Sequence, residues 1–208
     1  ARVIDVRDND GVERHVLEYL APFLITGPRV YNVAYPVGDV VGLDDRSLYT
    51  SSDPHLSAAQ RETASAFQKQ FRPSWPPTGA PFLGTAYFAV LEDRPTSHDY
   101  SRRPVVILMN ERCLSATDIF LGALYGLPNV TLMGVPSSGG SGRARDFTLP
   151  RSSVVVTIST MASFRPDGRL YDGYGVEPDV LVSPTLSDVA GQTDSQLDAA
   201  IRRLSPER

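Results

Sequence analysis

Cysteine, lysine and histidine are scarce in this 208-residue sequence. Cys113 is the single cysteine, Lys69 is the single lysine, and there are three histidines. A lone cysteine excludes an internal disulfide, so cysteine usage does not decide between a reducing and an oxidising compartment. The histidines lack the spacing of zinc ligands, and the cysteine has no partner for such a site. We therefore expect no metal site and no cofactor.

Long apolar runs and basic runs are also missing. No stretch approaches the roughly 20 apolar residues of a membrane-spanning helix, so we expect no membrane span in this chain. The formal net charge is -4 and the isoelectric point is about 5.4, and no cluster of basic residues could follow a phosphate backbone. Nucleic acid is therefore not an expected partner. The hydrophobic content of 41% is enough for an ordinary folded core.

Strand-like and helix-like segments alternate along the chain. Apolar, β-branched runs predict strands at residues 1–7, 30–41, 84–93, 103–110, 129–136 and 153–160. Helical spacing predicts helices at 12–24, 57–71, 115–126 and 194–204, the last capped at Thr193 or Asp194. This order predicts an α/β domain with a mainly parallel sheet. Because the first residues already read as a buried strand, we expect residues 1–208 to be the C-terminal portion of one longer domain.

Residues 44–81 differ in composition from the rest of the chain. They are polar and contain five prolines, Pro54, Pro73, Pro76, Pro77 and Pro81. We interpret this stretch as an excursion from the core that carries one helix, with Ser57 as its N-cap. Long connections of this kind in compact domains are usually functional or mobile.

Ser115 stands where the strand of 103–110 gives way to the helix of 115–126. One interpretation is structural: Ser115 and Asp118 fit a capping box, in which the serine oxygen accepts from the third helical amide. The other is chemical. A serine at the carboxyl end of a parallel strand lies where α/β proteins bind ligands, and the Ala116 amide would point at an oxyanion formed there. Ser115 alone leaves both interpretations open.

Four motifs in a fixed order add context to this serine. They are VIDVRDNDG, RPVVILMNERCLSATDIFLGAL, NVTLMGVPSSGGSG and RPDGRLYDGYGVEPDVLV, and together they extend over nearly the whole chain. In this order they resemble the motifs of the tail-specific, or C-terminal processing, family of serine peptidases. The resemblance implies a spiral of βαβ units akin to the Clp protease and crotonase folds, with its N-terminal part missing from this chain. It also implies a peptide or protein substrate.

The resemblance implies roles for four residues. Ser115 would be the nucleophile, and the Ala116 amide would donate to the oxyanion. A second donor would come from the turn that contains Gly11. Asp172, within YDGYGVEPD, would be the carboxylate that organises the base. The turn departs from the family pattern, because Val12 stands where a second glycine is usual and disfavours a positive φ.

The general base is the larger departure. Part of the family uses a lysine some two dozen residues after the serine, but the segment PSSGGSGR contains none, and the Arg143 guanidinium does not deprotonate at working pH. Lys69 lies in the proline-rich stretch, on an expected solvated helix face. The branch typified by the tricorn protease core fits better, since its base is a histidine from the N-terminal half. That histidine would precede residue 1 and belong to an upstream segment of the same protein.

His15, His55 and His98 are the weaker candidates for the base, because helical or polar-loop positions favour solvated roles. The sequence therefore predicts a serine endopeptidase acting by acyl transfer, with little or no activity in residues 1–208 alone. Two alternatives stay open: a non-catalytic binding module with the same fold, and a hydrolase of small esters or amides. The family resemblance alone suggests a bacterial periplasmic or extracellular location.

Overall fold

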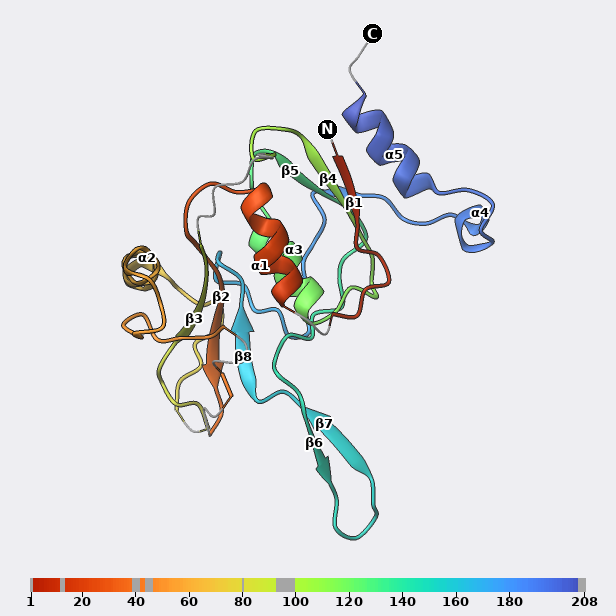
Figure 1. The fold of residues 1–208 in the computed structure, drawn as a ribbon. Coiled ribbons are helices and arrows are strands. Elements are labelled where there is room, and N and C mark those ends of the chain that lie inside the picture. Colours follow the sequence, from red (N-terminus) through yellow and green to blue (C-terminus); the bar gives the residue numbers. More distant parts are fainter. Residues whose placement is uncertain are drawn as a thin grey trace. The chain divides into compact units, whose positions relative to one another are not determined.

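The computed structural model describes residues 2–11, 14–38, 42–43, 47–79, 81–92 and 100–205. They form two compact units. The first comprises Ala1–Gly27, Asp93–Gly139 and Tyr174–Arg208, and the second comprises Pro28–Glu92 and Gly140–Gly173. Both units contain helices and strands (Figure 1), which confirms the predicted α/β class.

The first unit is built on a parallel four-stranded sheet. Its strands are β1 (Arg2–Asp5), β4 (Val105–Met109), β5 (Val130–Gly134) and β9 (Val180–Leu181), in the order β1-β4-β5-β9. All three pairings are parallel, as predicted from the alternation of strands and helices. All five residues of β4 are buried. A continuous apolar run such as VVILM is typical of a central parallel strand covered on both faces.

The helices of the first unit are α1 (His15–Leu20), the 3-10 turn η1 (Ala21–Phe23), α3 (Ala116–Leu124), α4 (Leu186–Val189) and α5 (Ser195–Leu204). Every residue of α3 is buried, so this helix is a core element. Helix α5 presents Ala200 and Leu197 to an apolar cluster that includes Val106 and Leu108 of β4. Its N-cap is Asp194, whose carboxylate accepts from the Leu197 amide, which selects one of the two predicted caps.

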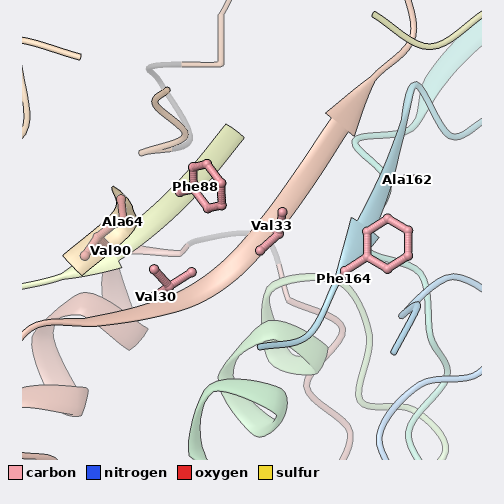
Figure 2. Packing of buried hydrophobic residues seen from close by; sticks show 7 residues of the cluster. All are labelled: Val30, Val33, Ala64, Phe88, Val90, Ala162 and Phe164. Carbon is pink, nitrogen blue, oxygen red and sulfur yellow. The ribbon is translucent and has the colours of Figure 1, made fainter. Parts of the chain in front are cut away.

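The second unit contains an antiparallel sheet and one long helix. Strands β2 (Arg29–Pro36), β3 (Tyr87–Leu91) and β8 (Met161–Phe164) have the order β3-β2-β8, with a bulge in β2 between Val30 and Asn32. Helix α2 (Ala58–Gln70) starts at Ser57 in a capping box, as predicted. Figure 2 shows the core of this unit, which consists of Val30, Val33, Ala64, Phe88, Val90, Ala162 and Phe164.

A separate two-stranded hairpin completes the second unit. Strand β6 (Arg145–Thr148) pairs with β7 (Val155–Ile158) in an antiparallel hairpin (Figure 1). No residue of either strand is buried. The sequence predicted a strand at 153–160 but not its partner, because RDFT alternates without a sustained apolar run. Within the predicted run only Val155–Ile158 form a strand, β7, and β8 begins just after the run, at Met161.

The proline-rich stretch is more tightly connected to the core than its composition suggests. In its described part, Tyr49 bridges to Phe88 of β3, and Leu48 and Leu56 are buried. The prediction of one helix in this stretch is met by α2. Residues 44–46 and 80 lie outside the described residues. Among the residues that the structure describes, no helix has the length and hydropathy needed to cross a membrane.

Candidate active site

Ser115 lies at the junction between β4 and α3, after the turn Asn110–Leu114. Its backbone has φ 58° and ψ -114°, a conformation that residues other than glycine rarely adopt. Such strain costs on the order of 1–3 kcal/mol and persists only where the surrounding structure enforces it. The residue is half-buried rather than enclosed. A strained, partly accessible serine at a strand-to-helix turn is therefore the first feature of the candidate site.

The turn that contains Gly11 packs directly on this junction. Gly11 has φ +94°, and a Cβ atom there would lie 2.5 Å from the Leu114 oxygen and 2.7 Å from the Ala116 nitrogen. The same atom would lie 3.0 Å from Cβ of Ser115. Only glycine fits, for two separate reasons: the backbone conformation and the absence of space. The structure thus brings together Ser115, Ala116 and Gly11, three of the four predicted site residues.

Asn9 fastens the turn to the helix N-terminus. Its backbone oxygen accepts from the Leu114 amide at 3.2 Å, and its side-chain Oδ1 accepts from Thr117 Oγ1 at 3.0 Å. On the outer side of the turn, the Asp8 amide donates to Asn110 Oδ1, and Asn110 Nδ2 donates back to Asp8 Oδ1. These bonds fix the separation between the Gly11 turn and the Ser115 junction.

The two predicted oxyanion donors are in different states. Ala116 is the first residue of α3, and a first-turn amide has no acceptor within its own helix. The Gly11 amide instead donates to Asn9 Oδ1 at 2.9 Å. To donate to an oxyanion, Gly11 would have to exchange this bond. Val12, the next residue of this turn, lies outside the described residues.

Asp118 connects the junction to two later segments. It is fully buried, and its Oδ2 accepts from the Ser115 amide at 2.9 Å, which is the carboxylate half of the predicted capping box. Its Oδ1 accepts from Ser137 Oγ at 2.5 Å and from the Gly139 amide at 3.1 Å. Sequence reasoning missed Ser137, because nothing in its local pattern indicates a partner 19 positions earlier. The one signal was its place in the third family-like motif.

Asp172 belongs to the second unit, where it is half-buried. Its Oδ1 accepts from Ser159 Oγ at 3.4 Å, and a Cβ atom on Gly142 would approach that oxygen to 2.9 Å. Neighbouring Tyr171 is fully buried. Asp172 is therefore held by two neighbouring segments rather than on a loose turn. Its pairing with Ser115 stays a prediction.

Of the candidate bases, the two whose side chains the structure describes, His55 and Lys69, are both exposed. His55 is exposed, and its Nδ1 lies 2.8 Å from Asp53 Oδ1 while its ring stacks on Tyr49. Lys69 is exposed near the end of α2. His15 lies in α1 with an undescribed side chain, and His98 lies outside the described residues.

Cys113 is the other potential nucleophile near the junction. It is fully buried, and its thiol donates to the Val6 oxygen at 3.1 Å. Burial raises the pKa of Cys113 to about 11. Since the thiolate is the reactive form, the thiol is a poor competitor for Ser115 near neutral pH. Over the described ranges, no group of three or more His, Cys, Asp or Glu is arranged to hold a metal ion.

A cavity of about 540 Å³ lies in the first unit, beside the turn that precedes the junction. It is lined by Asp5, Arg7, Asp8, Asn110, Glu111, Arg112, Pro184, Asp188, Val189, Thr193, Asp194 and Gln196. Ser115 and Ala116 do not line it. The Arg7 guanidinium there is held by Asp5 and Asp194, and these carboxylates raise the pKa of Arg7 further above its ordinary value. We therefore assign the candidate site to the Ser115 junction and not to this cavity.

Comparison with known proteins identifies the family of the chain. The model of peptidase family S41 matches residues 1–182. Mature CPAF is a structural neighbour with a TM-score of 0.67 and 18% identity over 97% of this chain and 42% of its own. A structure from Parabacteroides merdae assigned as a peptidase has a TM-score of 0.65 and 22% identity, over 97% of this chain and 51% of its own. No curated protein matches the chain.

A third neighbour is the photosystem II D1 C-terminal processing protease, with a TM-score of 0.52 and 18% identity over 92% of this chain. At these identities the likeness concerns the fold, and it confirms the expected Clp- and crotonase-like architecture. This chain spans only about half, or less, of the length of the neighbours, since it covers 51%, 42% and 38% of them.

Proposed function

The chain belongs to peptidase family S41, and we propose that it carries the nucleophile and oxyanion site of a serine endopeptidase of the tail-specific processing type. The observation that carries the proposal is the Ser115 junction. A serine with φ 58° stands immediately before a helix whose first amide lies against the Gly11 turn, so close that a Cβ atom on Gly11 would come within 2.7 Å of the Ala116 nitrogen. Strained nucleophiles beside preorganised amides are a recurrent arrangement in acyl transfer.

The proposed reaction is acyl transfer through a serine ester. Ser115 Oγ attacks the scissile carbonyl carbon while a base takes its proton, and the carbonyl electron pair moves onto the oxygen. The Ala116 amide donates to that oxyanion, and Gly11 joins it by exchanging its bond to Asn9 Oδ1. The tetrahedral intermediate then collapses, the amine leaves with a proton from the base, and water hydrolyses the acyl-enzyme by the same steps in reverse order.

The base and its orienting carboxylate form the second part of the proposal. We assign the carboxylate to Asp172, and we assign the base to a histidine outside residues 1–208. The exposure of His55 and Lys69 supports the assignment of the base to a residue outside this chain. A general base must be held in a fixed position within hydrogen-bond reach of the serine, and a side chain surrounded by water is not held in this way. Residues 1–208 alone should then have little or no peptidase activity. Robust cleavage by this chain would contradict an external base and redirect attention to its own histidines.

A non-catalytic binding module is the second candidate. The absence of a lysine in PSSGGSGR and the valine after Gly11 favour it. A hydrolase of small esters or amides would use the same serine, and the ratio of ester to peptide turnover separates it from the endopeptidase.

A fluorophosphonate probe on the full-length protein tests the nucleophile. We expect one label, on Ser115, and its complete loss in Ser115→Ala. Ser138→Ala is the matched control, since Ser138 lies in a nearby loop and its Oγ donates to the Glu111 oxygen. Labelling that survives Ser115→Ala, or no labelling of the wild type, would favour the binding module.

Asp172→Asn in the full-length enzyme tests the carboxylate. An aspartate that orients an imidazole contributes about 10⁴-fold in kcat where the same substitution has been measured in a triad. We expect a loss of several orders of magnitude in kcat, a much smaller change in KM, and an unchanged Tm. Ser159→Ala removes only the hydroxyl that donates to Asp172 and should cost far less. Unchanged turnover in Asp172→Asn would exclude the role.

A further inference from the structure

We propose that Asp118 is a positioning residue of this site, acting with Ser137 to hold the Ser115 junction in its strained conformation. The inference rests on the proposed function, because it assigns Asp118 a role in the reactivity of Ser115. The two side chains join three segments: the junction, the loop at 137–139, and the stretch that begins at Gly175. We call this pair the Asp118–Ser137 hub.

The hub is buried and fully engaged in hydrogen bonds from donors on separate segments. Asp118 is 0% exposed and Ser137 is 7% exposed. One carboxylate oxygen accepts from the Ser115 amide, and the other accepts from Ser137 Oγ and from the Gly139 amide. A buried carboxylate is costly unless it is satisfied in this way, so its position is defined by all three donors together.

A helix cap explains only part of this arrangement. The capping interaction accounts for the bond from the Ser115 amide to Oδ2. It does not account for the two bonds to Oδ1, which come from residues 19 and 21 positions further along the chain. An exposed aspartate would cap the helix equally well. The burial of Asp118 and its second set of donors therefore indicate a further role.

Ser137 extends the connection to the third segment. Its hydroxyl donates to Asp118 and accepts from the Val176 amide at 2.8 Å, while its own amide donates to the Val176 oxygen at 3.1 Å. Gly175 permits this approach, because a Cβ atom there would lie 2.3 Å from the Ser137 oxygen. With one donor and one acceptor role filled, the orientation of the Ser137 hydroxyl is fixed.

The consequence for the site follows from the backbone strain at Ser115. A residue with φ 58° and ψ -114° relaxes unless several contacts oppose it. The Gly11 turn opposes it from one side, and the bond to Asp118 holds its amide from the other. Relaxation of the Ser115 backbone would move Ser115 Oγ and tilt the Ala116 amide. A displacement of about 1 Å in such a site can lower the reaction rate by about 100-fold.

The test uses four variants of the full-length protein. Asp118→Asn keeps the size of the side chain but turns one acceptor into a donor that faces other donors. Ser137→Ala removes the hydroxyl, and Ser137→Thr restores it. The matched control is Asp188→Asn, since Asp188 caps the exposed helix α4 through bonds from Thr185 and Ser195. Each variant is characterised by its Tm, by the maximal rate of fluorophosphonate labelling, and by amide hydrogen exchange at residues 113–117.

We expect Asp118→Asn and Ser137→Ala to label roughly 10- to 100-fold more slowly at saturating probe, with little change in the half-saturating concentration. Their Ser115 amide should exchange at least tenfold faster at temperatures well below the Tm. Ser137→Thr should recover most of the rate, and Asp188→Asn should label like the wild type.

Labelling and exchange that match the wild type in Asp118→Asn and Ser137→Ala would overturn the inference. A slower rate that merely follows a lower Tm, with no rescue by Ser137→Thr, would also overturn it. If the wild type itself is not labelled, the proposed function fails. In that case, faster amide exchange in the two variants would still show that the hub holds the conformation of the junction. Unchanged exchange would show that the hub does not hold it.

Discussion

Strand β4 and strand β7 have similar sequences and opposite surroundings. The runs VVILM at 105–109 and VVVTI at 154–158 are both rich in β-branched residues. All five residues of β4 are buried, whereas Val155 and Ile158 of β7 are 55% and 51% exposed. β-branching predicted that both segments are strands, and both are. It carried no information on what would cover them, because burial depends on the neighbours that the fold supplies.

The neighbours account for the difference. Strand β4 has β1 on one edge and β5 on the other, and α5 packs against its residues Val106 and Leu108. Among the strands that the structure describes, β7 pairs with β6 alone. The register between β6 and β7 places apolar side chains on one face of the hairpin, namely Phe147, Leu149, Val154, Val156 and Ile158. On the other face Thr157 Oγ1 donates to Asp146 Oδ1 at 2.6 Å.

The largest expected difference between the two regions is in the free energy of unfolding. Ile107 is 0% exposed at the centre of β4, so Ile107→Ala leaves a cavity and should lower that free energy by about 2–5 kcal/mol. Val155→Ala is the matched change in β7. It should cost no more than about 0.5 kcal/mol, since the valine is already more than half exposed. Urea denaturation of both variants measures the contrast.

Comparable losses in Ile107→Ala and Val155→Ala would show that the hairpin is covered by something in solution. A loss near zero in both would mean that β4 does not belong to the cooperative core. In either event the contrast between the two strands would be wrong.

An intermediate effect is expected for thiol reactivity. Cys113 follows β4 and is buried, which raises its pKa to about 11. At pH 8 it should react with iodoacetamide at least about tenfold more slowly than an exposed thiol. The raised pKa lowers the fraction of Cys113 present as thiolate, and this loss is larger than the gain in nucleophilicity of each thiolate. The comparison thiol is placed on the hairpin turn by Ser152→Cys in a Cys113→Ser background. Rapid alkylation of Cys113 would contradict its burial.

The same thiol gives stability a pH dependence of known sign. The folded-state pKa of Cys113, about 11, exceeds the ordinary value of 9.0. Between these two pH values the folded state therefore keeps a proton that the unfolded state loses. The contribution is present below pH 9 and declines as the pH rises towards 11. Cys113→Ala should remove this part of the alkaline decline, which thermal unfolding between pH 8 and pH 11 would measure.

The sequence was sufficient for the elements whose patterns are local. Ser57 and its helix, the junction at Ser115 and the strand β4 all follow from capping residues and apolar periodicity within a dozen positions. The contact between the Gly11 turn and Ser115 was also predicted, but from the order of motifs and not from spacing. A separation of 104 positions has no periodic signal, and only the resemblance to a family supplied it.

The remaining features depend on contacts that leave no local trace. The sequence contains many carboxylates and serines, and nothing in it indicates that Asp118 and Ser137 are the two that bond to each other. The short strands β8 and β9 form only because β2 and β5 offer free edges for pairing. The residue type and position of Asn9 indicate an ordinary turn residue, although its side chain also accepts from Gly11 and Thr117. Polar residues have several compatible roles, and packing selects among them.

The smallest expected effect is at the apolar face of the hairpin. Phe147 is 49% exposed on β6, opposite Val156 in the register, and it contributes to no described core cluster. Phe147→Ser should change the free energy of unfolding by about 0.5 kcal/mol or less, because the side chain gives up little burial when the chain unfolds. Phe88→Ser is the matched control, since Phe88 is 1% exposed in the core of Figure 2 and should be strongly destabilised. If Phe147→Ser instead lowers stability as much as Phe88→Ser, the exposed face of the hairpin must be buried in the folded protein, and the contrast with β4 would not hold.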